Sequence, residues 1–258
     1  MKLYLVSAPV LERNYVDFLN DRGLSWSEQN PVNASDAERL VELSGRICYM
    51  SFGSLQSPRS NSQYIRNLID RGHESVLEHS TFSILADDIS RGLSHQLVRH
   101  RAGFSYSQLS QQYHDEANTT FVKPDGLDAY EDLRELWTAT VQQSLSSYQK
   151  MERELVASAA GDDLNSKERM RMIRSVCRSV LPAATTTCLM VTANARAWRN
   201  LLSVRGDIEG DFEMLDFCHG VFNLLYSHSP SLFADFEKVA GPQSHTMIRK
   251  LAPRPAGN

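Results

Sequence analysis

Residues 185–193, TTTCLMVTA, carry β-branched or apolar side chains at nearly every position. Such a run is typical of a strand that is buried in a protein interior. Helical patterns lie on both sides of it: one begins near Lys167 and ends at Pro182, and two more are expected near 195–205 and 211–228. The sequence therefore predicts an α+β fold, in which helices and a buried strand share one core.

The remaining patterns add helices and strands around this strand. Apolar residues recur at helical spacing through 130–158, which predicts a long amphipathic helix. Ser35 and Glu38 have the spacing of a capping box and predict the start of another helix. Residues 2–7 and 80–86 read as strands, and Ser90 is expected to cap a short helix that ends at an Arg-His-Arg triplet.

The C-terminal residues differ in composition from the rest. Residues 240–258 contain Gly, three Pro and little apolar content, so we expect a mobile tail. Since the sequence has no internal repeats and no clear linker, we predict one domain over residues 1–239.

Composition limits the kind of partner. The net charge of −4 argues against a general nucleic-acid-coating role, which usually requires a strong basic excess. No apolar run reaches the roughly 18 residues of a membrane-spanning helix, and the N-terminus lacks a signal-peptide pattern. The cysteines form no CxxC pair and read as reduced core thiols, which predicts a cytoplasmic location: Cys48, Cys177, Cys188 and Cys218.

The segment 97-LVRHRAGFSYSQLSQQY-113 is the strongest candidate site. Arg99, His100 and Arg101 end the short helix, where cations need no function because they favour helix C-termini. Hydroxyl and amide side chains then alternate with aromatic ones. Arginines and hydroxyls suit phosphate, whereas amides and aromatics suit a heterocycle, so the segment predicts a nucleotide or dinucleotide ligand. The sequence has neither GxGxxG nor a Walker A motif, which excludes those two ways of binding it.

Two later segments offer further polar side chains. Arg171, Arg174 and Arg178 share a helix face; a solvated face is expected for the first two, while Arg178 is the best candidate to reach a buried anion. In 192-TANARAWRNLLSVRGD-207, Asn194 reads as a helix N-cap, and Arg196 and Asn200 share a face.

The segment 72-GHESVLEH-79 contains two histidines and two glutamates. The histidines are six residues apart, however, and the zinc-binding HExxH pattern needs them at i and i+4. We therefore predict no metal site. His79, just before a strand, could still face a cleft.

Taken together, these segments resemble the flavin-dependent thymidylate synthases. The resemblance covers most of residues 38–237, in the family's order, through 45-GRICYMSFG, 72-GHESVLEH, 90-SRGLSHQLVRHR, 104-FSYSQLSQQY, 176-VCRSVLP, 192-TANARAWRNLLSVR and 229-SPSLFADFE. It implies a homotetramer in which an antiparallel sheet is packed by long helices, with FAD at subunit interfaces. It also implies reductive C5-methylation of a uracil nucleotide, with methylenetetrahydrofolate as carbon donor and NADPH as reductant.

The same resemblance assigns roles to individual residues. Arg205 is implied to stabilise the ionised pyrimidine ring and is the expected catalytic residue. The implied flavin-binding residues are His79, Thr81, Arg99, His100, Arg101, Gln108, Asn194, Arg196 and Asn200. The implied nucleotide-binding residues are Gln96, Arg99, Gln108, Ser110, Gln112, Arg178 and Arg205. Ser110 matches a serine once suspected as a nucleophile, but no activating base lies beside it in sequence, so we assign it to substrate positioning.

The chain departs from the family's pattern in the loop after Arg-His-Arg. Eight residues separate the Arg-His-Arg triplet from Ser110, one more than the family usually has. In addition, Gln112 stands where the family has an arginine that contacts the nucleotide. Glu209 also stands where many relatives have histidine, which puts the folate-side contacts in question. Loss of a guanidinium removes a permanent charge and a bidentate donor. We hypothesise that this site admits a ribose 2′-hydroxyl, so that UMP is methylated as well as, or instead of, dUMP, as in relatives from nucleoside-antibiotic biosynthesis.

Three other interpretations stay open from the sequence. The loop changes are harmless drift if Arg171 or Arg174 compensates for Gln112, since polar loops tolerate insertions. The chain is a non-methylating flavin-dependent reductase or binding protein if the uracil site is unused, although Gln96, Arg178 and Arg205 argue against this. A metal hydrolase built on the 72–79 segment is the third.

Overall fold

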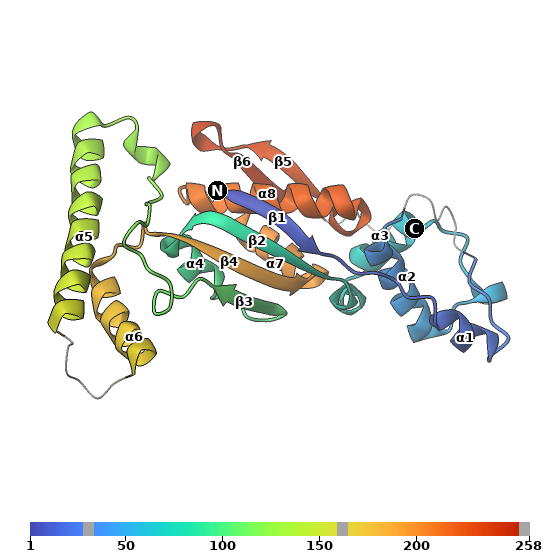
Figure 1. The fold of residues 1–258 in the computed structure, drawn as a ribbon. Coiled ribbons are helices and arrows are strands. Elements are labelled where there is room, and N and C mark those ends of the chain that lie inside the picture. Colours follow the sequence, from blue (N-terminus) through green and yellow to red (C-terminus); the bar gives the residue numbers. More distant parts are fainter. Residues whose placement is uncertain (28–33, 159–164, 253–258) are drawn as a thin grey trace. The chain divides into compact units, whose positions relative to one another are not determined.

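The computed structural model describes residues 1–27, 34–158 and 165–252. The chain, whose helices and strands are drawn in Figure 1, divides into two compact units that are interleaved in sequence. Unit 1 comprises residues 1–2, 86–99 and 107–190, and unit 2 comprises residues 3–85, 100–106 and 191–258.

The predicted mixture of helices and strands is confirmed. A four-stranded sheet has the order β1-β2-β4-β3, and β5 and β6 form an antiparallel pair. The strand bounds are β1 Lys2–Ser7, β2 Thr81–Ser90, β3 Phe104–Gln108, β4 Thr186–Asn194, β5 Phe236–Ala240 and β6 Thr246–Lys250. In β4, side chains at every second position are buried, as the β-branched run predicts.

In the described part of unit 2, four helices begin at a residue whose side chain caps them: Ser35, Ser60, Asn194 and Asp211. Ser35 and Ser60 each form a complete capping box, with Glu38 and Gln63 as the reciprocal partners. The helices of this unit include α1 Tyr15–Asn20, α2 Asp36–Tyr49, α3 Asn61–Asp70, the 3₁₀ helix η3 Glu74–His79, α7 Ala195–Arg205 and α8 Phe212–His228. Trp198 of α7 and Phe217 of α8 are fully buried in the core of this unit.

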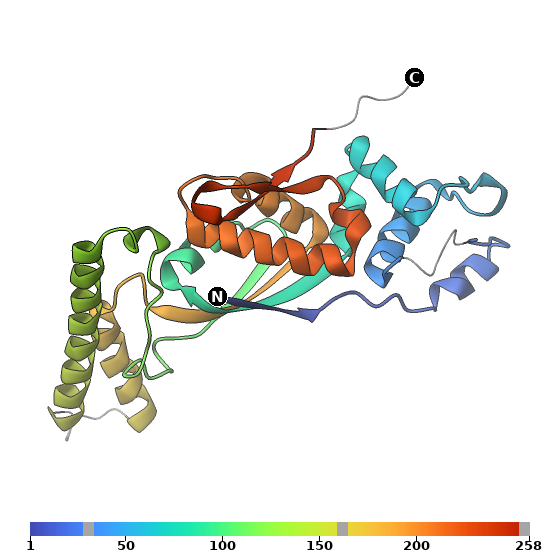
Figure 2. The ribbon, with the colours of Figure 1, turned by 90° about the horizontal axis from the view of Figure 1, so that it is seen from above.

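Unit 1 is built around three helices: α4 Arg91–Leu97, α5 Glu131–Ser158 and α6 Ser166–Cys177. The predicted long helix is therefore confirmed almost to the residue. Helices α5 and α6 lie side by side (Figure 2) and bury Tyr148 against Ile173 and Cys177. The break predicted at 161–166 falls largely outside the described residues, but α6 begins at the side-chain cap of Asn165. None of the described helices combines the length and hydropathy that a membrane span requires.

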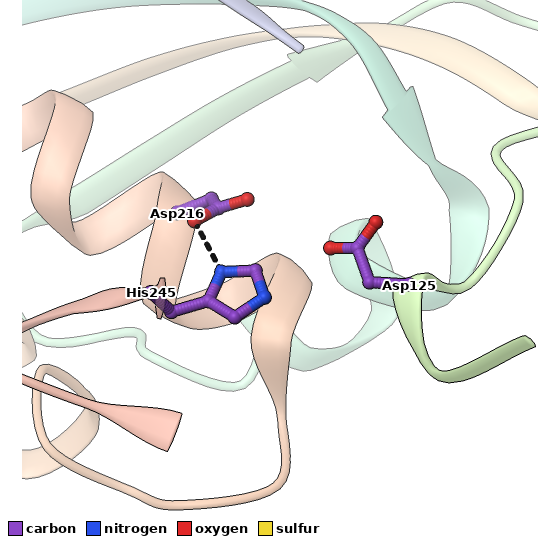
Figure 3. A group of neighbouring side chains, drawn as sticks. All are labelled: Asp125, Asp216 and His245. Carbon is purple, nitrogen blue, oxygen red and sulfur yellow. Dashed lines mark hydrogen bonds and ion pairs between the residues drawn. The ribbon is translucent and has the colours of Figure 1, made fainter. Parts of the chain in front are cut away.

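The C-terminal residues differ from the mobile tail that composition predicts. Residues 246–250 form β6, which pairs with β5 in register from Ala240↔Thr246 to Phe236↔Lys250. Met247 and Ile248 are buried, and His245 stacks on Phe212 and pairs with Asp216 of α8 at 2.8 Å (Figure 3). These contacts and the pairing with β5 hold the strand in place, although the segment as a whole is polar. Residues 253–258 lie outside the described residues.

Two smaller expectations also differ. The segment after Arg-His-Arg reads as a polar loop, but its first part is strand β3, in which aromatic and polar residues alternate. Cys48 is exposed rather than buried in the core, whereas Cys177 and Cys218 are buried and Cys188 is partly so; all four are free thiols.

Candidate functional site

Unit 2 contains a cavity of about 580 Å³ at the N-terminus of α7, here called the α7 cavity. Its size lies within the usual range for small-molecule sites. Residues from α7 and from the turn before β3 line it together with glutamates of η3: Glu74, Glu78, Ala102, Gly103, Asn194, Arg196, Ala197, Arg199, Asn200, Ser203 and Lys250.

The start of α7 explains how this cavity is formed. Asn194 is the N-cap that the sequence predicts, and its side chain accepts a hydrogen bond from the Ala197 amide at 2.9 Å. Gly103 packs closely against this helix start with φ of +76°. A Cβ at Gly103 would lie 2.8 Å from Asn194 Nδ2 and 2.9 Å from Ala197 Cβ. Only glycine lets the turn come this close to the helix end.

The lining is rich in charge. Arg196 pairs with Glu78 at 2.6 Å and lies 4.0 Å from Glu74, which is also 3.7 Å from both Arg199 and Lys250. Arg199 is also paired with Asp235 through both Nη atoms, at 2.5 and 2.7 Å, but its buried Nε has no hydrogen-bond partner. A helix N-terminus combined with an unused guanidinium donor is suited to phosphate. The residues present therefore fit a phosphate-bearing cofactor.

His100 and Arg205 contact each other elsewhere in unit 2. Arg205 Nε donates to His100 Nε2 at 3.2 Å, and the hydroxyl of Tyr106 donates to the carbonyl of His100 at 2.7 Å. Because an arginine only donates, His100 must accept through an unprotonated Nε2 and carry its proton on Nδ1. Burial, reinforced by the Arg205 charge, lowers the pKa of His100 and favours this neutral form.

Aromatic packing supports the His100 segment. Phe104 stacks parallel to Tyr106, with ring centroids 5.8 Å apart, and meets the buried Trp198 edge-on at 5.3 Å. Burial raises the pKa of Tyr106, so its hydroxyl stays protonated as a donor to His100. His100, the central residue of the Arg-His-Arg triplet, is therefore packed and hydrogen-bonded rather than solvated.

The residues predicted to bind the flavin divide between cavity and surface. Asn194, Arg196 and Asn200 line the α7 cavity together. His79, Thr81 and Arg101 belong to the same unit but are exposed and do not line it. Arg99 and Gln108 belong to unit 1.

The residues predicted to bind the nucleotide lie in unit 1, apart from Arg205. Gln108 Nε2 donates to Ser94 Oγ at 2.9 Å and Thr187 Oγ1 at 3.4 Å, so its amide is fixed by β4 and α4. Ser110 Oγ accepts a hydrogen bond from the backbone N–H of Gln112 at 3.3 Å. Gln96, Arg99 and Arg178 are exposed.

Gln112 is tied to α6 by its side chain. Its Nε2 donates to Ser175 Oγ at 3.0 Å. On the same helix, Arg174 Nη1 donates to the carbonyl of Tyr113 at 2.6 Å, and its Nε lies 3.8 Å from Glu152. Arg174 is therefore partly buried and engaged, and the solvated face expected from its spacing is wrong for this residue. Arg171 is exposed, as expected.

Arg91 was missed by the sequence analysis. Its Nη2 donates to the carbonyl of Leu109 at 2.8 Å and lies 4.0 Å from the buried Glu116. Burial lowers the pKa of Arg91; Glu116 opposes this effect, and the charge of Arg178 adds to it. Arg91 and Arg174 thus hold the two ends of the 109–113 segment. Helical spacing alone carries no signal for contacts so distant in sequence.

The fold and these sites define a protein that has a charged cavity at a helix N-terminus in one unit and a cation-flanked polar loop in the other. The sequence model of one family, described as "Thymidylate synthase complementing protein", matches residues 32–231. The chain belongs to this family, as its motifs predict.

Individual relatives give the same result. The flavin-dependent thymidylate synthase of Mycobacterium sp. (strain KMS) is 40% identical over 211 residues, which cover 80% of this chain and 82% of the relative. The proteins of the same name from Mycobacterium marinum (strain ATCC BAA-535 / M) and Mycobacterium tuberculosis (strain ATCC 25177 / H37Ra) are each 38% identical over 223 residues, or 86% of both chains.

Proposed function

We propose that the protein is an FAD-dependent enzyme that methylates C5 of a uracil nucleotide, with methylenetetrahydrofolate as carbon donor and NADPH as reductant. One observation carries the proposal: Asn194, Arg196 and Asn200, three residues that the motifs assign to the flavin, line one cavity at a helix N-terminus. Such a helix end favours a bound pyrophosphate through its amides and dipole.

A bound flavin supplies hydride chemistry, and the chain's own residues have to orient the uracil and stabilise its charge. Arg205 is the proposed catalytic residue, and neutral His100 holds its guanidinium by accepting from Nε. Burial raises the pKa of Cys177, Cys188 and Cys218, which makes these thiols poor nucleophiles. This agrees with a reaction that depends on positioning and electrostatics rather than on a thiolate.

The nucleotide is proposed to bind the polar loop of unit 1 through Gln96, Arg99, Gln108, Ser110, Gln112 and Arg178. Arg178 is exposed and forms no ion pair with any described residue, so its charge is available for a phosphate. Arg174, by contrast, already donates to the Tyr113 carbonyl. It is therefore a poor replacement for the guanidinium that Gln112 lacks, which supports an altered nucleotide site over harmless drift.

The substrate hypothesis is that this altered site accepts UMP beside dUMP. A competition assay tests it: purified protein, FAD, NADPH and methylenetetrahydrofolate meet equal amounts of dUMP and UMP under low oxygen, and product masses are compared. We expect comparable methylation of both. Gln112→Arg should shift the ratio toward dUMP by about 10-fold, because the bulkier guanidinium would leave less room for the ribose 2′-hydroxyl, and a small steric difference in a pocket is worth about this much.

The outcomes separate the two parts of the proposal. Methylated dUMP alone would retain the methylation and discard the UMP hypothesis. Neither product, with flavin bound, would contradict the methylation and favour a non-methylating flavin reductase. Ser175→Ala is the matched control for Gln112→Arg, since it releases the Gln112 side chain from α6 without adding charge.

The proposed assembly is a homotetramer in the cytoplasm. Exposed apolar side chains on α5 and α6 support contacts between subunits: Leu133, Leu136, Val156, Met172 and Val176. Light scattering of the purified protein is expected to give a tetramer mass, and a monomer mass would contradict this part of the proposal.

A further inference from the structure

A second cavity in unit 2, of about 310 Å³, lies where α2 and α3 end. We call it the α3 cavity. The ends of both helices and the loop between them line it: Arg46, Tyr49, Ser51, Leu55, Ser57, Arg59, Tyr64, Asn67, Leu68, Arg71 and His73. None of these residues has a role in the proposed reaction.

The charge of the α3 cavity is one-sided. Three arginines and a histidine line it, and no described aspartate or glutamate does. Arg59 and Arg71 are exposed, and within the described ranges no carboxylate pairs with either of them. This differs from the α7 cavity, where Glu74 and Glu78 oppose the cations. Unopposed guanidinium groups that converge on one hollow are suited to carboxylate or phosphate.

Local interactions fix this arrangement. Arg46 is fully buried, pairs with Glu42 at 2.7 Å and lies over the ring of Tyr64, so it forms a neutralised wall rather than a free cation. Arg46 Nη1 also donates to the carbonyl of Ser51 at 3.1 Å and so holds the loop in place. Arg59 Nη1 donates to Ser57 Oγ at 3.2 Å. The macrodipole of α3 accounts for a cation at Arg71 but not for Arg59, which precedes the helix.

The rim of the cavity is apolar and aromatic. Tyr49 is 67% exposed and Leu55 is 73% exposed, although both side chains are large and hydrophobic. A cavity of this size holds one ring and its charged group, not a whole dinucleotide. The exposed ring of Tyr49 beside two unopposed arginines suits a ligand ring that bears an anionic substituent.

We propose that the α3 cavity binds the anionic end of an aromatic co-substrate, with Arg59 and Arg71 as the charged contacts and Tyr49 against the ring. The identity of the ligand rests on the proposed function, which offers two sources of this chemistry. One is the glutamate carboxylates of the folate, and the other is the 2′-phosphate of NADPH.

The test compares pairs of probes that differ in this charge. Folate and pteroate, which lacks the glutamate, are titrated by calorimetry into the FAD-loaded protein at low salt, as are NADPH and NADH. Arg59→Gln and Arg71→Gln are compared with Arg66→Gln, an arginine of α3 that pairs with Asp70 and does not line the cavity. Unfolding temperature and dUMP affinity are measured for each variant.

We expect wild type to prefer the more highly charged member of one pair, folate or NADPH, and both cavity variants to weaken that member's binding by about 10-fold or more, the equivalent of one lost charged contact. Binding of the less charged member and of dUMP should be unchanged in these variants, and Arg66→Gln should bind every probe as wild type does. The affected pair identifies the folate or the NADPH as the source. If neither pair of probes shows a binding preference that Arg59→Gln and Arg71→Gln weaken, the proposal is overturned. Because the readout is binding, it succeeds or fails independently of whether any nucleotide is methylated.

Discussion

Arg205→Gln is expected to lower kcat/KM for nucleotide methylation by about 100-fold or more, the usual effect of removing a charge-stabilising donor from an active site. In the proposed reaction the Arg205 guanidinium lies beside the uracil ring and stabilises the negative charge that develops on it. Glutamine keeps a donor but loses the charge. Because Arg205 is only partly buried, the fold should persist, so the loss should appear in turnover rather than in stability.

Steady-state kinetics and thermal unfolding of the same preparations test this expectation. Arg249→Gln is the control, an exposed arginine of unit 2 that lies 3.6 Å from Asp207. Nuclear magnetic resonance gives a second readout: the pKa of His100 should rise in Arg205→Gln, since the neighbouring charge contributes to its depression, yet stay below its ordinary value because burial remains. Unchanged turnover would remove Arg205 from the mechanism.

Arg199→Met is expected to destabilise the protein by about 3–5 kcal/mol, the usual cost of leaving a buried charge unpaired. Arg199 and Asp235 are both buried and form a bidentate pair, at 2.5 Å from Nη1 to Oδ1 and 2.7 Å from Nη2 to Oδ2. Arg199 Nη1 also donates to the carbonyl of Leu232 at 2.6 Å. Methionine removes all of these donors and strands the carboxylate of Asp235.

Denaturant unfolding measures the effect, and a double variant separates its causes. Arg199→Met combined with Asp235→Leu should recover much of the lost stability, because replacing both members of a buried pair with apolar groups is often close to neutral. Arg249→Gln should cost less than about 1 kcal/mol, as exposed pairs do. A loss in Arg199→Met no larger than in Arg249→Gln would show that the buried pair contributes little.

Local sequence patterns predicted the helices well, because their causes are local. Helix α5 follows from one sustained apolar stripe, and Ser35, Ser90 and Asn194 each cap a helix through an amide three residues ahead. The family was also predictable, since its motifs are spread along the chain in order. Asn194, Arg196 and Asn200 could be named before their shared cavity was known.

Contacts between distant segments could not be read in this way. Arg174 has the spacing of a solvated face, yet it donates to a carbonyl of the 109–113 segment. Strand β6 is short, and its partner β5 supplies the backbone hydrogen bonds that make it a strand. The need for glycine at position 103 likewise arises from the start of α7, far along the chain. Each case depends on tertiary packing, which overrides the local pattern.

A single-turnover experiment on the flavin-loaded protein tests the central claim most directly. The flavin is reduced with NADPH without oxygen, excess NADPH is removed, and dUMP or UMP is added with methylenetetrahydrofolate. Flavin absorbance and nucleotide mass are followed together. The account predicts that the flavin is reoxidised and that an equal amount of methylated nucleotide forms, since one reduced flavin supplies the two electrons for one methyl group. Reoxidation without methylated nucleotide, or no reoxidation when both substrates are present, would contradict it.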